Sequence, residues 1–429
     1  MHAPVASTWT MGQRWRLLAL LCLVGAFNFI DRQIITVLIV PIQADFGASD
    51  TQLGLLTGLL FAGSYALASI PLATLSDRYQ RKYVLAGCLS VWSMMTALGG
   101  AATSFVQLAM TRVGVAVAEA GAVPASHSMI SDIFPVRQRA TAIAVFSAVQ
   151  SLGIGAGVFL GGMMVGSLGW RLTLVLVGIP GLVLALILVA SREPRRGMSE
   201  EVRAPQQAAG GPLAAIGLLM RVPGYPWLCL LMASVGFSGF GILSWGPSFL
   251  HRWHGLTLEA VGAAFGGAVA LGLIIGNLVA GPLADRWGRR GLENYALVAA
   301  LGVALAIVPG LFFIFSPGPE LALAGLFFFQ IFLTFHLPAA YALGQTLAPP
   351  NNRAMASVLL GLASSGLGGG LAPLTIGWLS DLLGPSSGAQ SLRDALLATI
   401  LAALVAIVAA MIAYAKLRQA RKTTMGEIR

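Results

Sequence analysis

Long apolar runs recur along almost the whole chain, and they limit its fold more than any other feature. A helix needs about 20 largely apolar residues to cross the roughly 30 Å hydrocarbon core of a bilayer. We find twelve such runs in the 429 residues, of which 57% are hydrophobic and only 10% charged. An average soluble domain is about a quarter charged. The sequence therefore predicts an all-α polytopic membrane protein with twelve transmembrane helices.

The expected spans fall into two groups of six, separated by a polar stretch. This predicts an N-terminal six-helix half at 1–190, a cytoplasmic linker at 191–224, and a C-terminal six-helix half with a short cytoplasmic tail at 225–429. The expected spans are 16–41, 52–76, 83–102, 105–131, 138–164, 170–190, 226–250, 258–283, 292–315, 320–347, 354–381 and 393–417.

The basic residues are distributed unevenly over the segments between these spans. Only Arg171, Arg252 and Arg393 fall in the expected outer segments, and Arg32 and Arg112 fall inside spans. All other Lys and Arg residues fall in the inner segments, as the positive-inside rule describes. Both termini are therefore expected to be cytoplasmic, and the net charge of +10 is an orientation signal rather than a nucleic-acid surface.

A short motif recurs at the same place in each half. The junction after the second expected span reads Ser-Asp77-Arg78-Tyr-Gln-Arg-Lys, and the junction after the eighth reads Ala-Asp285-Arg286-Trp-Gly-Arg-Arg. The two aspartates are 208 residues apart. Two six-helix halves with such an internal repeat are typical of transporters that rock their halves around a midplane site.

The second junction resembles the signature of the major facilitator superfamily, Gly-x-x-x-Asp-Arg-x-Gly-Arg-Arg, in full. The first junction departs from it, with Ala73 for the leading Gly and Gln80 for the inner one. Within that superfamily, the chain resembles the spinster-type lipid transporters in four runs, which are Phe27 to Gln33, Ser49 to Gly58, Arg112 to Pro124, and Ser131 to Pro135. The resemblance implies secondary transport by alternating access.

The repeated Asp-Arg motif is a candidate gate. Asp77 or Asp285 at a helix end can pair with an arginine of a neighbouring helix and with a helix N-terminus, and this would latch the inner gate in one state. Arg78 and Arg286 belong to the same hypothesis. The alternative is that both loops are only positive-inside signals.

Four ionisable residues are expected well inside spans: Asp31, Arg32, Arg112 and Glu119. Each would cost about 2.5–3.5 kcal/mol near the bilayer centre, so pairing is close to obligatory. Arg112 and Glu119 are two helical turns apart on one face, and Asp31 and Arg32 should lie at depths between them. Asp31–Arg112 and Arg32–Glu119 pairs are therefore possible.

These four residues predict either a coupling and substrate site or a static polar staple between two helices. If they form a coupling and substrate site, Glu119 is the first candidate for the proton carrier and Asp31 is the second. Arg32 and Arg112 are then expected to bind the substrate.

The equivalent positions of the second half carry aromatic rather than charged residues. We expect Phe240, Trp245 and Phe327 to contact substrate, with His336 as a further candidate. A cavity that is charged on one wall and aromatic on the other suits an amphiphile with an anionic head group. The alternative for each phenylalanine is that it faces lipid.

Motifs for hydrolases, zinc proteases and ATP-driven pumps do not occur in the sequence. We therefore expect no catalytic residue, no metal and no cofactor, with protons as the coupling ion. The leading hypothesis is a proton-coupled transporter of a lysolipid or sphingoid phosphate. The alternatives are a transporter of a small polar organic anion or sugar and, less supported, a channel or an intramembrane enzyme.

The partners expected are an amphiphilic substrate and the lipid bilayer, with no nucleic acid, and the protein is expected to be a monomer. The absence of N-glycosylation sequons and the strong preference for Arg over Lys favour a bacterial inner membrane.

Overall fold

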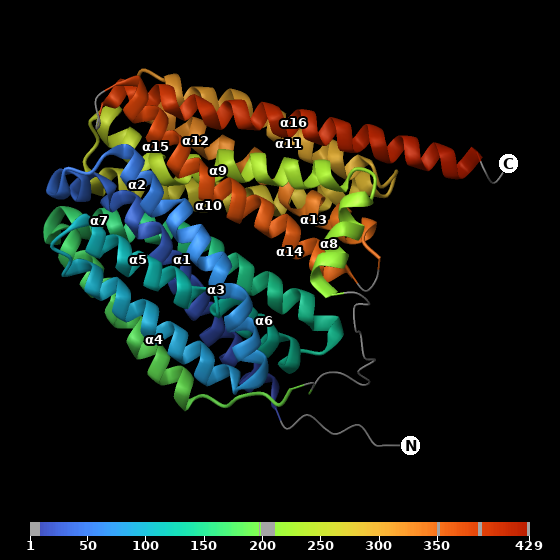
Figure 1. The fold of residues 1–429 in the computed structure, drawn as a ribbon, viewed down its shortest axis with the longest axis horizontal. Helices are drawn as coiled ribbons and strands as arrows, with labels where there is room; N and C mark the ends of the chain where they lie inside the picture. The colour runs from blue at the N-terminus through green and yellow to red at the C-terminus, as the bar shows by residue number, and fades with distance from the viewer. Residues whose placement is uncertain (1–8, 197, 199–210, 350–351, 385–387, 427–429) are drawn as a thin grey trace. The chain divides into compact units, whose positions relative to one another are not determined.

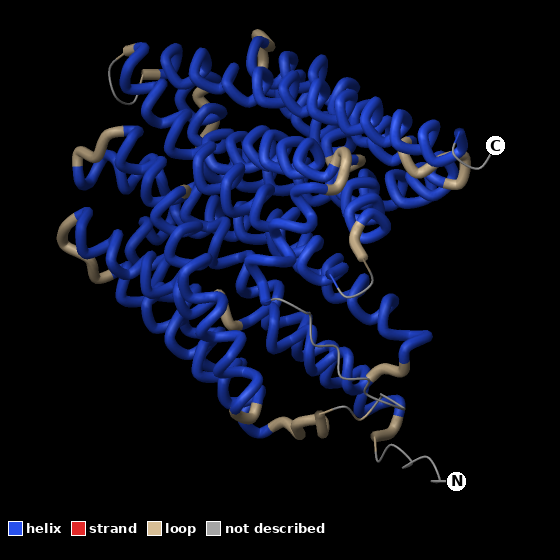
Figure 2. The backbone as a smooth tube through the Cα atoms, turned by 45° about the vertical axis from the view of Figure 1, so that its right-hand side comes forward, coloured by secondary structure: helices blue, strands red, loops and turns tan. Residues whose placement is uncertain are grey.

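The structure is a computed structural model that describes residues 9–196, 198, 211–349, 352–384 and 388–426. Within these ranges the backbone is almost entirely helical and contains no β-strand, as Figure 2 shows. The expected all-α class is therefore confirmed.

The helices differ widely in length because several expected spans consist of more than one helical piece. In chain order they are α1 (Met11–Phe46), α2 (Asp50–Thr57), α3 (Leu59–Arg78), α4 (Arg81–Gly100), α5 (Phe105–Glu119), α6 (Ala122–Ile133), α7 (Val136–Ala190), α8 (Gly211–Arg221), α9 (Tyr225–His254), α10 (Leu258–Gly288), α11 (Asn294–Phe315), α12 (Pro319–Leu333), α13 (His336–Leu347), α14 (Arg353–Gly361), the π-helix η2 (Leu362–Gly368), α15 (Gly369–Leu383) and α16 (Ala389–Gly426).

Eleven segments of the described chain are long and apolar enough to cross a membrane. One of them, Thr141–Ala190, has 50 residues and is too long for a single crossing. It is interrupted at Gly169, whose φ of 72° and ψ of 164° are not helical and favour glycine. This segment therefore contains the fifth and sixth expected spans, and all twelve expected spans are present.

Four expected spans are broken within their length. The second changes from α2 to α3 at Gly58, where φ is −107° and ψ is −105°. The eleventh contains the π-helix η2, and the fourth and tenth each consist of two helices. Glu119 is the last residue of α5 and His336 is the first residue of α13, so two candidate site residues lie beside such breaks.

Local sequence signals explain where two of the helices begin. Thr10 and Gln13 form a reciprocal capping box at the start of α1, and Ser49 and Gln52 form one at the start of α2. Each box satisfies backbone N–H groups that have no partner inside the helix. Gly47 then ends α1 in the left-handed conformation with φ of 63°.

The chain divides into two compact units. Unit 1 contains 1–48, 60–205 and 258–266. Unit 2 contains 49–59, 206–257 and 267–429. The start of the second expected span therefore packs in unit 2, and the start of the eighth packs in unit 1. The helix α8 lies in the expected linker.

In unit 1, α7 packs against both α1 and α4, as Figure 1 shows. The contact between α1 and α7 is close because glycines lie at the interface. A Cβ atom at Gly157 would lie 2.7 Å from the carbonyl oxygen of Ile30. Small residues that permit such backbone contact are typical of helix packing in membranes.

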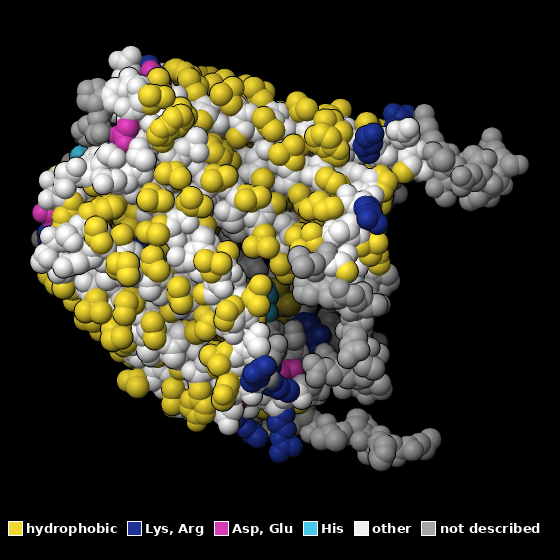
Figure 3. Space-filling view, in the orientation of Figure 1, with side chains coloured by type: hydrophobic (Ala, Val, Ile, Leu, Met, Phe, Trp, Pro, Cys, Tyr) yellow, Lys and Arg dark blue, Asp and Glu magenta, His cyan; other side chains and the backbone are white. Residues whose placement is uncertain are grey.

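In unit 2, α9 packs against α15, α16 and η2, and α11 packs against α12 and α16. Many large hydrophobic side chains in both units are exposed, such as Leu67, Leu186 and Leu278. Figure 3 shows hydrophobic side chains spread over the visible face, and most of the visible Lys and Arg side chains lie toward the right-hand side of that view. This pattern matches a surface in contact with lipid.

Candidate functional site

The four charged residues predicted inside the spans all belong to unit 1. Asp31 on α1 is 3% exposed, and both of its carboxylate oxygens accept from the Thr96 hydroxyl of α4, at 2.8 and 2.7 Å. The Nη1 atom of Arg112 on α5 lies 3.6 Å from Oδ1 of Asp31. The structure therefore brings together Asp31 and Arg112, one of the two pairs that their expected depths made possible.

Arg32 and Arg112 both lie against Phe61 of α3. The guanidinium carbon of Arg32 is 4.8 Å from the centre of the Phe61 ring, and that of Arg112 is 5.5 Å away. The ring of Tyr65 stacks on Phe61 with a centroid distance of 6.4 Å and an interplanar angle of 22°. Cation–π contacts of this kind attract a guanidinium group to the face of a ring, and the attraction is stronger where the groups are desolvated.

Glu119 is completely buried at the end of α5. Neither of its carboxylate oxygens accepts a hydrogen bond from an N–H or hydroxyl donor in the described part of the chain, and its carboxyl lies within hydrogen-bonding reach of the Asp31 carboxyl. Asp31, Arg112 and Arg32 are the charged groups close enough to act on it electrostatically. We call Asp31, Arg32, Arg112 and Glu119 the Asp31 cluster. It contains two acids and two arginines, so its formal charge is zero when all four are ionised.

The Asp31 cluster is incompletely hydrogen-bonded. Nη1 of Arg112 makes no hydrogen bond within the described residues, because 3.6 Å from Asp31 is too long for one. Buried polar groups in proteins are nearly always paired, so these unused atoms are unusual. They leave a buried donor on Arg112 and buried acceptors on Glu119, to which a proton or an anionic ligand can bind.

The four predicted substrate contacts of the second half lie in unit 2. Phe240 is partly buried beside Gly369, and Phe327 packs on the cluster of Ala280, Ile331 and Phe335. Trp245 is fully buried and donates from Nε1 to the Pro373 carbonyl at 2.9 Å. His336 is 9% exposed, and its Nδ1 contacts the Leu333 carbonyl.

The predicted gating residues lie at the ends of α3 and α10. The side chain of Asp77 lies outside the described residues, and Arg78 is exposed. Asp285 and Arg286 are exposed and line a surface depression of about 460 Å³ with Pro282 and Arg289. Across the described chain, neither Asp285 nor Arg286 forms an ion pair. The latch stays a prediction.

A different residue of the first motif organises its surroundings. Arg81 is only 2% exposed and pairs with Asp132 of α6 and with Glu193, which follows α7. It also donates to the Ser128 hydroxyl and to the Pro194 carbonyl, both at 2.8 Å. Both Arg81 and Asp132 stand in runs that carry the family resemblance, and only this burial distinguishes Arg81 from the other basic residues of its loop.

A second buried charge cluster lies in unit 2, and sequence reasoning did not identify it. Asp50 at the start of α2 is fully buried and accepts from both terminal nitrogens of Arg252 on α9, each at 2.9 Å. The Ser380 hydroxyl donates to the same carboxylate at 2.7 Å. Asp381 of α15 accepts from the Asp50 and Thr51 backbone N–H groups and from the Thr51 hydroxyl.

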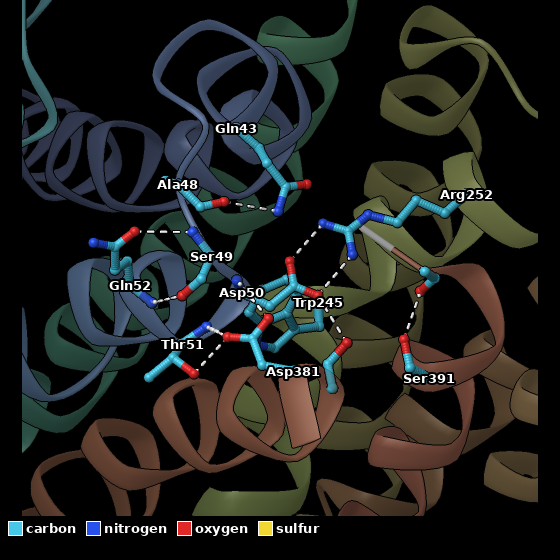
Figure 4. Close-up of polar contacts among 12 residues, drawn as sticks. Gln43, Ala48, Ser49, Asp50, Thr51, Gln52, Trp245, Arg252, Asp381 and Ser391 are labelled. Carbon is cyan, nitrogen blue, oxygen red and sulfur yellow. Dashed lines mark hydrogen bonds and ion pairs between the residues drawn. The ribbon is translucent and has the colours of Figure 1, made fainter. Parts of the chain in front are cut away.

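We call Asp50, Thr51, Arg252, Ser380 and Asp381 the Asp50 cluster, and Figure 4 shows most of it. The backbones of α2 and α15 approach closely beside it, since a Cβ at Gly377 would lie 2.2 Å from the Asp50 carbonyl oxygen. The available sequence signal was that Arg252 is one of three basic residues in the expected outer segments. Nothing in the sequence indicated that its partner stands 202 positions earlier.

The described residues contain no group of three or more His, Cys, Asp or Glu side chains that could hold a metal ion. The three cysteines are free thiols, and two of them are buried.

Comparison with known proteins gives consistent matches along the chain. The family model described as Major Facilitator Superfamily matches residues 21–373 and 268–426. An MFS-type efflux pump of Mycolicibacterium smegmatis is 34% identical over 390 residues, covering 90% of this chain and 89% of that protein. A hexuronate transporter of Bacillus subtilis is 24% identical over 384 residues, covering 88% of this chain and 90% of that one.

The structure is also similar to a crystal structure of a bacterial homologue of the human lysosomal transporter Spinster, in an inward-facing and unoccupied conformation. The TM-score is 0.87 at 30% identity, and the match covers 96% of this chain and 99% of that one. The sequence resemblance to spinster-type proteins therefore extends to the fold of nearly the whole chain.

Proposed function

Since the chain belongs to the major facilitator superfamily, a family of transporters rather than enzymes, we propose that it is a proton-coupled secondary transporter of an amphiphilic anion. The solute class is a lysolipid or a sphingoid phosphate, and transport proceeds by alternating access. We place the protein in a bacterial inner membrane as a monomer with both termini cytoplasmic. The observation that carries this proposal is the incomplete bonding of the Asp31 cluster.

Proton coupling is supported by the position of Glu119. An ionised carboxylate that is buried without a hydrogen-bond donor is costly, so Glu119 is a group that gains from taking up a proton. Protonation of one acid changes the formal charge of the Asp31 cluster from zero to +1. This makes the cluster more attractive to an anion, and so couples the uptake of a proton to the binding of substrate.

The binding of an anionic head group is supported by Arg112 and its surroundings. Arg112 retains a buried donor atom, and guanidinium groups bind phosphate and carboxylate through paired hydrogen bonds. Phe61 and Tyr65 supply apolar surface beside it. A site with a cation and aromatic rings suits a molecule that is charged at one end and apolar at the other. Phe240, Trp245, Phe327 and His336 remain predicted contacts.

A second candidate is supported by the Bacillus subtilis relative. A hexuronate is a small polar carboxylate, and the match to that transporter spans most of both chains. The same arginines would bind its carboxylate, but no acyl chain would need apolar surface. The two candidates therefore differ in whether affinity depends on the apolar part of the solute.

The test uses purified protein in liposomes with an imposed pH gradient, and it measures uptake of lysophospholipids, sphingoid phosphates and hexuronates. We expect saturable, gradient-driven transport of the amphiphiles. The Glu119→Gln variant should lose gradient-driven uptake but keep exchange of substrate across the membrane. Glu320→Gln is the matched control, because it makes the same change on an exposed residue.

Transport of hexuronates alone would replace the lipid proposal with the second candidate. If both Glu119→Gln and Asp31→Asn retain full gradient-driven uptake, neither acid carries the coupled proton, and the cluster is a static staple. Flux that does not saturate would indicate a channel.

A further inference from the structure

Two amide side chains in unit 1 have a buried donor without a hydrogen-bond partner. Asn28 on α1 is 4% exposed, and its Nδ2 atom makes no hydrogen bond within the described residues. The Nε2 atom of Gln150 on α7 is buried and unbonded in the same way. Neither residue belongs to the Asp31 cluster, and sequence reasoning selected neither. Because buried side-chain amides are nearly always paired, two unused donors in one unit indicate a binding partner outside the chain.

Asn28 lies on the face of α1 that carries the Asp31 cluster. It precedes Asp31 by three residues and Arg32 by four, the spacing at which side chains are neighbours on a helix surface. Asp31 accepts from Thr96 of α4 and lies 3.6 Å from Arg112 of α5, so this face of α1 points into the interior of unit 1. The unused donor of Asn28 is therefore next to the buried charges.

The depth of Asn28 lies between those of the two incompletely bonded residues of the Asp31 cluster. α1 and α5 belong to the first and fourth spans, so they cross the membrane in opposite directions. Arg112 is level with Asp31, and Glu119 lies about 10 Å further toward the N-terminal end of α1. Asn28 is displaced from Asp31 in that same direction by about 4.5 Å. Its donor is therefore placed beside any group that binds at Arg112.

Gln150 lies beside α1 one turn beyond Asn28. A Cβ atom at Gly25 would lie 3.1 Å from Cγ of Gln150, so the glutamine side chain covers Gly25. Gly25 precedes Asn28 by three residues and Arg32 by seven, which keeps all three on one side of the helix. Arg112, Asn28 and Gln150 therefore offer three unused donors one after another along α1, at steps of about 4.5 Å.

We propose that the two amides bind the oxygen-rich part of the solute's head group, an inference that rests on the proposed function. The anionic group binds at Arg112, Asn28 donates to a hydroxyl oxygen one turn of α1 away, and Gln150 donates to the next oxygen along the head group. This narrows the solute to an anion with hydroxyl and ester oxygens beside its charge, as in a glycerol-based lysophosphatidic acid. An anion without the hydroxyl would leave the Asn28 donor unpaired, which is costly in a buried site.

The test compares two lipids that differ in one hydroxyl group. Oleoyl lysophosphatidic acid has a free glycerol hydroxyl, and the analogue built on propanediol lacks it but has the same chain, ester and phosphate. Binding is measured on the purified full-length protein in detergent. We expect wild type to bind the hydroxylated lipid about fivefold more tightly, the net effect of one hydrogen bond. Asn28→Leu, which removes the donor, should bind the two lipids equally well.

The matched control is Asn277→Leu on α10. It makes the same change at an exposed amide that already donates to the Leu273 carbonyl at 2.9 Å, and it should keep the wild-type preference. Equal affinity of wild type for the two lipids would overturn the proposal without the use of any variant. A preference that survives in Asn28→Leu would also overturn it, because another group would then bind the hydroxyl.

The role of Gln150 is tested with the same two lipids. Both retain the ester oxygen, so Gln150→Leu should weaken the binding of both by a similar factor of about fivefold and keep the preference for the hydroxyl. Unchanged affinity in this variant would overturn the part of Gln150 in the site.

Uptake into liposomes separates the failure of this inference from the failure of the proposed function. Gradient-driven uptake of both lipids by wild type without a preference for the hydroxyl would remove the amide site and keep the proposed function. A hydroxyl preference in binding without any gradient-driven uptake would keep the amide site and remove the proposed function. Glucuronate, which also has hydroxyl groups beside an anionic group, should compete only weakly. Competition stronger than that of the lipid would overturn the lysolipid as the source of the hydroxyl.

Discussion

The two buried charge clusters differ in how completely their polar atoms are used. In the Asp50 cluster, Arg252 and Asp50 form two hydrogen bonds of 2.9 Å, and the side chains are 6% and 0% exposed. In the Asp31 cluster, Arg112 lies 3.6 Å from Asp31, and the two side chains are buried to the same degree. In the described chain, Nη1 of Arg112 makes no hydrogen bond, and neither oxygen of Glu119 accepts one from an N–H or hydroxyl donor.

This difference separates a structural role from a functional one. A buried ion pair is costly to break when every member is bonded, because the remaining partner becomes an uncompensated charge. The Asp50 cluster fits that description, and it attaches the short helix α2 to α9 and α15. A cluster with unused donors and acceptors can instead change its protonation or bind a ligand without losing its fold.

The largest effect is expected from breaking the Asp50 cluster at its cation. Arg252→Ala would leave Asp50 buried without its charge partner, and it should lower the free energy of unfolding by about 3–5 kcal/mol. The measurement is reversible unfolding in detergent. Arg393→Ala is the matched control, because its pair with Asp394 is 21% and 35% exposed and should be worth less than about 1 kcal/mol. Equal losses in the two variants would mean that the Asp50 pair is not desolvated.

The same change from acid to amide should act differently in the two clusters. Asp50→Asn weakens hydrogen bonds to a charged guanidinium and should cost about 2 kcal/mol of unfolding free energy. Glu119→Gln removes a buried charge that accepts no hydrogen bond, and it should change stability by less than about 1 kcal/mol. Unfolding of both variants and gradient-driven uptake by Glu119→Gln are the measurements.

Uptake by Glu119→Gln should fall at least about tenfold, equivalent to 1.4 kcal/mol, although the protein stays folded. A strongly destabilised Glu119→Gln variant would contradict this interpretation. It would show that Glu119 takes part in a complete structural network, as Asp50 does.

The role of Arg112 as a head-group ligand can be tested separately from the binding of an acyl chain. If Arg112 binds the head group, Arg112→Gln should reduce affinity by a similar factor for solutes of every chain length. In both the wild type and the Arg112→Gln variant, the binding free energy should become more favourable by about 0.8 kcal/mol for each added methylene that is buried, which is roughly a fourfold gain in affinity. Competition binding with a homologous series of lysolipids measures both quantities. An affinity that is independent of chain length would favour the small polar solute.

The smallest effect is expected at the repeated motif. Asp285 is exposed and unpaired within the described residues, so Asp285→Asn should leave stability unchanged within about 0.5 kcal/mol. If the latch forms in another state of the transport cycle, turnover should fall a few-fold while substrate affinity changes less. Transport rates and binding measured on the same preparation distinguish these effects. If the Asp285→Asn variant has the same turnover as wild type, the latch hypothesis is wrong and the motif serves only as a signal for membrane orientation.

Several features of the site followed from the sequence because they depend on local properties. Charged residues inside apolar runs identified the Asp31 cluster, and their expected depths made a pair of Asp31 and Arg112 possible, which the structure contains. The same reasoning selected Asp77 and Asp285 and passed over Arg81, whose burial and pairing with Asp132 and Glu193 depend on how α4, α6 and the end of α7 meet.

The sequence by itself determined the twelve spans, since a bilayer requires each to be long and apolar, and it predicted a pair of related halves. Only the tertiary structure decided that 49–59 packs in unit 2, because Gly58 permits a break between α2 and α3 and Gly377 admits the Asp50 backbone. The Asp50–Arg252 pair depends on that packing. Asp50 and Arg252 are 202 residues apart in the sequence, and the hydrophobicity of the spans carries no information about which helices touch.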